Sequence, residues 1–120
     1  MKVKLVGFFN ELPHGIPNGG SLKKNINLIP QVDKEKILDY LTSGHAWIIS
    51  PGVVKDILSH EDIVIGAPNI LTDGVWAWPE DLIYYIRKYN VTLPDDFFHH
   101  MIKNSWKIPE CDLNRLEFEV

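Results

Sequence analysis

The sequence predicts an α+β fold made of a single domain, residues 1–120, in which two or three helices pack on a small, mostly antiparallel sheet. Three observations support this expectation. Apolar residues make up 45% of the 120 residues, which is enough for one self-supporting core. Short apolar runs alternate along the chain with segments of helical periodicity. Two of the short runs flank Asp73-Gly74, a dipeptide that strongly favours a β-hairpin.

The N-terminal segment predicts a strand, a loop and a short helical turn. In residues 2–9, lysines alternate with apolar residues before the run becomes wholly apolar, as in a strand that enters the core. Residues 10–20 contain two prolines and three glycines and are expected to form a loop. Ser21 is expected to cap a helical turn that ends at Asn25.

Glu11 and His14 lie in that loop and are candidate partner- or ligand-binding residues. Polar side chains on a loop that follows a buried strand often contact partners. The glycines of the loop do not indicate nucleotide binding. A Walker-type phosphate loop needs a lysine directly after its last glycine, whereas Ser21 follows Gly20 here.

A helix is expected from Asp33, its N-cap, to about Ser43, with Gly44 as the left-handed residue that ends it. The apolar face of this helix consists of Ile37, Leu38 and Leu41. Three short strands are then expected, at residues 46–50, 53–57 and 63–66.

The hairpin is expected to join residues 69–72 to residues 75–78. Its turn is predicted to be of type I′, in which Asp73 and Gly74 both take positive φ. Asp73 is also a candidate partner- or ligand-binding residue.

A second helix is expected to begin at Pro79, where the missing N–H costs nothing. Glu80 and Asp81 then lie in the first turn, where the helix dipole favours carboxylates. Asn90 is suited to the left-handed conformation that ends the helix. The apolar face is formed by Leu82, Tyr85, Ile86 and Tyr89.

The C-terminal part predicts a third helix and an edge strand. Pro94 and two aspartates open a helix that runs to about Asn104. Its apolar face is formed by Phe97, Phe98, Met101 and Ile102. Residues 115–120 alternate in polarity and are expected to form a final edge strand.

Trp76 and Trp78 are expected to point to one side of their strand, with Val75 and Ala77 on the other. If the tryptophans face outward, they form an aromatic platform suited to a protein or ligand. If they face inward, they are part of the core, which residue statistics favour. Tyr84 lies off the apolar face of the second helix and is a further candidate for a partner surface.

Composition limits the classes of function. The net charge of −4 and the pI of about 5.7 argue against binding to nucleic acid phosphates. No apolar run approaches the roughly 20 residues of a membrane span, so we expect no membrane partner. Cys111 is the only cysteine, which excludes an intrachain disulfide and suits a reducing compartment. The expected location is the cytoplasm.

No motif indicates a reaction, so an enzyme is not the leading interpretation, and we expect no cofactor or metal. None of the five histidines forms the helical i, i+4 pair of a zinc protease. Cys111 has acidic residues on both sides, which disfavours the reactive thiolate. A strand–GxSxG–helix element is also lacking.

One long segment resembles a known pattern. Residues 70–101, ILTDGVWAWPEDLIYYIRKYNVTLPDDFFHHM, resemble a group of small bacterial proteins with the pattern T-D-G-x-W-x-W-P-x-D-L-x-Y-Y-x-x-x-Y-x-V-x-L-P-x-x-F. Residues 6–22 and 51–58 resemble the same group. No activity is established for this group, but proteins of this size and style include many immunity proteins encoded beside secreted bacterial toxins. The resemblance therefore implies a role in protein interaction, by analogy.

Two hypotheses follow. The leading hypothesis is a cytoplasmic protein-binding domain of the immunity type, with a toxin or a second copy of the chain as its partner. The alternative is a small-molecule-binding protein or enzyme with its site near the Glu11/His14 loop and the Trp76/Trp78 hairpin, to which His45 would contribute. Convergence of these side chains in one pocket would favour the alternative.

Overall fold

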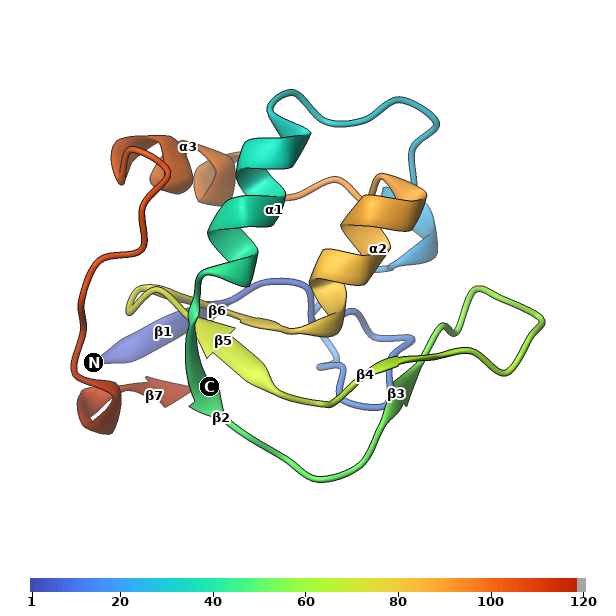
Figure 1. The fold of residues 1–120 in the computed structure, drawn as a ribbon, viewed down its shortest axis with the longest axis horizontal. Helices are drawn as coiled ribbons and strands as arrows, with labels where there is room; N and C mark the ends of the chain where they lie inside the picture. Colours follow the sequence, from blue (N-terminus) through green and yellow to red (C-terminus); the bar gives the residue numbers. More distant parts are fainter. Residues whose placement is uncertain (119–120) are drawn as a thin grey trace.

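A five-stranded sheet forms the centre of the fold, and three helices lie together on one of its faces (Figure 1). The computed structural model describes residues 1–118. The order of the strands in the sheet is β2-β5-β6-β1-β7. Their bounds are β1 Lys2–Leu5, β2 His45–Ile48, β5 Ile70–Thr72, β6 Trp76–Pro79 and β7 Glu117–Phe118. The strands β3 (Val54–Lys55) and β4 (Val64–Gly66) form a separate two-stranded sheet.

The strand pairings confirm the predicted α+β class with a mostly antiparallel sheet. Three of the five strand pairs are antiparallel, namely β2–β5, β5–β6 and β3–β4. The strand β1 is parallel both to β6 and to β7. The predicted hairpin is therefore at the centre of the sheet, between β2 and the N-terminal strand.

The helices α1 (Lys34–Thr42), α2 (Asp81–Tyr89) and α3 (Asp95–Lys103) confirm the three predicted helices. Short 3₁₀ turns are present at η1 (Lys23–Asn25), as expected, and at η2 (Leu113–Arg115), which was not expected. No helix in residues 1–118 is long and apolar enough to cross a membrane.

The two faces of the sheet are covered differently. Trp76 and Trp78 point toward the helices and belong to the main core, together with Phe97 of α3. Val3 and Ala77 point to the opposite face, where Leu116 packs on them from the C-terminal segment. The tryptophans are therefore core residues and do not form an outward platform: Trp76 is 6% exposed and Trp78 is fully buried.

Both ends of α1 are at the predicted residues, but neither has the predicted geometry. Asp33 adopts a left-handed conformation with φ of 61°, and its side chain caps no amide, because an N-cap side chain reaches the first turn from an extended backbone. Ser43 is the C-cap and Gly44 follows it directly, as predicted, but Gly44 does not have the predicted positive φ. Glycine is needed at position 44 for close packing, since a Cβ there would lie 2.6 Å from Cζ2 of Trp78.

The predicted hairpin is confirmed, but its type I′ turn was wrong. Only Gly74 has positive φ, at 95°, while Asp73 does not. The Asp73 side chain accepts hydrogen bonds from the amides of Val75 and Trp76, so a side chain holds the turn. Pro79 was also misplaced: it ends β6 opposite Ile70, and α2 begins at Asp81.

The remaining differences concern the ends of elements. The first strand leaves the sheet after Leu5, and Phe8 and Phe9 become buried outside it. Asn90 takes the predicted left-handed conformation and ends α2. The predicted edge strand at 115–120 is confirmed at β7, and its last two residues lie outside the described residues.

Candidate functional site

The candidate site residues do not converge in one place. Glu11 and His14 belong to the N-terminal loop but make separate contacts. Asp73 is buried beneath α1 and α3, and Tyr84 lies on α2 beside Asp56. The alternative hypothesis therefore loses the single composite site on which it was based.

Glu11 organises the N-terminal loop. Its carboxylate accepts hydrogen bonds from the Ser21 hydroxyl at 2.9 Å and from the amides of Leu22 and Lys23 at 2.7 and 3.0 Å. Burial opposes ionisation, but these hydrogen bonds outweigh it and hold the pKa of Glu11 below its ordinary value. Glu11 is thus the main cap of η1, a duty that sequence reasoning assigned to Ser21.

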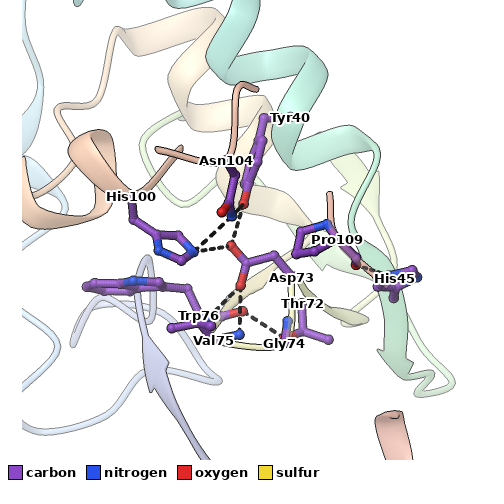
Figure 2. A network of polar contacts seen from close by, with 10 residues as sticks. All are labelled: Tyr40, His45, Thr72, Asp73, Gly74, Val75, Trp76, His100, Asn104 and Pro109. Carbon is purple, nitrogen blue, oxygen red and sulfur yellow. Dashed lines mark hydrogen bonds and ion pairs between the residues drawn. The ribbon is translucent and has the colours of Figure 1, made fainter. Parts of the chain in front are cut away.

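Asp73 is the centre of a buried polar network that joins the hairpin to two helices (Figure 2). Its Oδ2 accepts a hydrogen bond from the Tyr40 hydroxyl at 2.5 Å and lies 2.9 Å from Nε2 of His100. When Nε2 of His100 carries the proton of the imidazole, it donates to this carboxylate. Asn104, one turn further along the chain, donates to the Tyr40 hydroxyl at 3.0 Å. No sequence pattern places Tyr40, His100 and Asn104 together around Asp73.

The contact between Asp73 and His100 has the composition of an Asp–His catalytic pair. The nearest thiol is that of Cys111, which packs against Gly74. Burial, together with the charges of Asp73 and Asp112, raises the pKa of the Cys111 thiol, which disfavours the thiolate. We therefore interpret the network as a structural connection between the hairpin, α1 and α3.

Asp56 is the centre of a second polar cluster. Its side chain is buried and accepts hydrogen bonds from the hydroxyls of Tyr84 and Tyr89 at 2.7 and 2.6 Å, while Nζ of Lys88 lies 3.6 Å away. Burial opposes ionisation, but these contacts and the Leu58 amide lower the pKa of Asp56. The Tyr84 side chain is half-buried, and its hydroxyl already donates a hydrogen bond to Asp56 within the chain.

The tyrosines lead to a prediction about alkaline pH. The chain contains four, Tyr40, Tyr84, Tyr85 and Tyr89. Burial is the main cause that raises the pKa of each, to about 12 for Tyr85, above the ordinary value of about 10. The folded chain thus keeps protons that the unfolded chain releases. This contribution to stability is complete below pH of about 10 and is lost as the pH rises above it.

We expect no tyrosine to ionise near pH 10 while the chain is folded. Tyrosinate absorbance should instead rise in one cooperative step at higher pH, together with the loss of the far-ultraviolet circular dichroism signal. The chain unfolded in guanidinium chloride is the control and should titrate near pH 10. A tyrosine that ionises near pH 10 in the folded chain would contradict the burial and hydrogen bonding described above.

His14 and Asp81 form the most unusual polar pair in the described residues. The imidazole Nε2 lies 3.1 Å from Oδ2 of Asp81, but the direction of the contact does not fit a hydrogen bond. Within residues 1–118, Oδ1 and Oδ2 of Asp81 are buried and have no hydrogen-bond partner. Buried polar groups are nearly always hydrogen-bonded, so this carboxylate is exceptional.

The pair lies at a pocket of about 470 Å³ whose walls are mostly apolar. The walls come from the N-terminal loop, from the region of β3, and from Pro68 ahead of β5. Lys55 also lines the pocket, but its ammonium lies 2.7 Å from the exposed carboxylate of Asp62. Sequence reasoning selected His14 but explained Asp81 only as a first-turn carboxylate. No sequence signal placed the two together.

A second feature is a segment of exposed apolar side chains between η1 and α1. Leu28 is 98% exposed, Ile29 79% and Val32 73%. The segment is nevertheless anchored at both ends: Asn27 donates to the carbonyl of Tyr89, and Gln31 accepts from the amide of Leu93. The ordered backbone therefore keeps these side chains exposed to solvent.

Two further results bear on function. Within the part of the chain that the structure describes, no group of three or more His, Cys, Asp or Glu side chains is placed to hold a metal ion. A comparison with models of known protein families, with curated proteins and with solved structures finds no match for this chain.

Proposed function

We propose that this chain is a protein-binding domain of the immunity type, which inhibits a toxin by covering part of its surface. The observation that carries the proposal is the exposed apolar segment at residues 28–32. Burial of apolar surface contributes about 25 cal/mol per Å², so large apolar side chains held together in water favour a partner that covers them.

Two features of the sequence support the same proposal. The resemblance of residues 70–101 to a group of small bacterial proteins implies an interaction role by analogy. The net charge of −4 favours rapid, salt-dependent association with a basic partner.

The test is binding to the product of the neighbouring gene, measured by calorimetry with purified proteins. The triple variant Leu28→Ser/Ile29→Ser/Val32→Ser should weaken the affinity at least about tenfold, because truncation of a single hot-spot residue in an interface costs about 2 kcal/mol or more. Its fold should be unchanged, since these side chains are in solvent.

The matched control is Ile49→Ser/Val53→Ser/Val64→Ser, which removes three other exposed apolar side chains and should leave the affinity unchanged. If the control variant alone lost binding, the interface would lie outside residues 28–32. Failure of the wild-type chain to bind the neighbouring product would contradict the immunity-type function. A dimer in light scattering that dissociates in the first triple variant would identify a second copy of the chain as the partner.

A further inference from the structure

Asp81 presents a carboxylate that the rest of the described chain does not satisfy. The side chain is 2% exposed, and both oxygens are without a hydrogen-bond partner in residues 1–118. Its position at the first residue of α2 allows the helix dipole to favour a negative charge there. The dipole makes an anion tolerable, but it does not supply the donors that a buried carboxylate requires.

His14 does not complete the site. Its Nε2 is close to the carboxylate but poorly aligned with it, and Nε2 is itself buried without a partner. The carboxylate oxygens of Asp81 therefore remain acceptors for a ligand with several N–H groups.

The apolar walls of the pocket determine the chemistry of the rest of the ligand. They consist mainly of Leu12, Pro13, Val53, Val54, Ile57 and Pro68. The volume of about 470 Å³ lies in the range of about 300–1,000 Å³ that is typical of small-molecule sites. An apolar group would lie against these walls, while an anion would be repelled by Asp81.

We propose that this pocket binds a compact cationic group, a primary ammonium or an amidinium-like group on an apolar body, whose N–H groups donate to Asp81. The same chemistry is carried by free amines and by the side chains of lysine and arginine in a protein. The pocket is separate from residues 28–32, so this proposal goes beyond the protein-binding function and does not depend on it.

The test is a titration of the isotope-labelled full chain, followed by amide chemical shifts, with probes that share one apolar body. Benzylamine and benzamidine should shift the amides of residues 12–14, 53–57 and 81 in a saturable way. Benzyl alcohol and benzoate are the neutral and anionic controls and should bind at least about tenfold more weakly, because a hydrogen bond to a charged group is worth about 1.5–3 kcal/mol. Equal binding of benzyl alcohol would show a purely apolar pocket and overturn the proposal.

Variants locate the effect at Asp81. Asp81→Asn should weaken benzamidine binding at least about tenfold and leave the melting temperature equal to or above that of the wild type. Asp39→Asn removes the same charge from an exposed position of α1 that does not line the pocket and should leave the affinity unchanged. His14→Gln keeps a neutral group beside Asp81 and should retain binding. Should Asp81→Asn lower the melting temperature sharply and leave the affinity unchanged, Asp81 is a structural residue.

Two further measurements complete the test. The first distinguishes a free amine from a protein side chain as the ligand, and the second distinguishes this proposal from the protein-binding function. Acetyl-arginine methylamide represents an arginine side chain of a protein, and tighter binding of it than of benzamidine would assign the pocket to a protein anchor. Tighter binding of benzamidine assigns it to free amines. The Leu28→Ser/Ile29→Ser/Val32→Ser variant should bind benzamidine as the wild type does, whatever its affinity for a protein partner.

Discussion

Replacement of Asp73 by alanine is expected to lower the free energy of unfolding by about 3–5 kcal/mol. The carboxylate is 1% exposed and is the acceptor for the Tyr40 hydroxyl, for His100 and for the amides of Val75 and Trp76. Alanine leaves these donors buried without an acceptor, and each such group costs about 1–3 kcal/mol. Relaxation of the hairpin recovers part of this cost.

The measurement is urea unfolding at neutral pH, followed by far-ultraviolet circular dichroism. Asp95→Ala is the matched control, since Asp95 is an exposed aspartate in the first turn of α3, and its loss should cost less than about 1 kcal/mol. Asp73→Asn retains one oxygen acceptor and should fall between the two. A cost below about 1 kcal/mol for Asp73→Ala would show that the network contributes little to stability.

The hairpin shows where local sequence information was sufficient and where it was not. The Asp-Gly dipeptide predicted the hairpin correctly. It did not predict the register, because Thr72 pairs with Ala77 and the amide of Asp73 donates to the carbonyl of Trp76, so that Gly74 and Val75 are the central residues of the turn. The type of turn depended on the Asp73 side chain, which bonds the turn with one oxygen and receives Tyr40 and His100 on the other. Those partners lie 33 and 27 residues away in the chain, so no local pattern reveals them.

The orientation of the tryptophans was open for a similar reason. Alternation along β6 determines that Trp76 and Trp78 share a side, but not which side the helices cover. The position of Phe97 shows which side the helices cover. The centroid of its ring lies 4.9 Å from the ring centroid of Trp76 and 5.7 Å from that of Trp78. The opposite face receives Leu116 from the C-terminal segment.

The candidate pocket was only partly predictable. His14 was selected because it is a polar residue on a loop after a buried strand. Asp81 has a structural explanation in the sequence alone, because the dipole of a helix favours a carboxylate at its start. The pocket exists because the N-terminal loop and β3 meet at the start of α2, segments that are far apart in the sequence. Only tertiary structure shows that the carboxylate has no hydrogen-bond donor within residues 1–118.

Replacement of Trp78 by alanine is also expected to lower the free energy of unfolding by about 3–5 kcal/mol. Trp78 is fully buried, its indole N–H donates to the carbonyl of Leu41 at 3.2 Å, and its ring packs against Tyr40 and Phe97. Gly44 has no side chain that could fill the space left by the indole, so a cavity would remain.

Trp47→Ala is the matched control, because it deletes the same side chain from a partly exposed position beside Phe118. It should cost clearly less than Trp78→Ala, since water replaces part of the lost contact and no closed cavity forms. Far-ultraviolet circular dichroism in urea is the measurement, because tryptophan fluorescence itself changes in both variants. Equal losses for the two variants would mean that the sheet face at Trp47 contributes as much stability as the helical core.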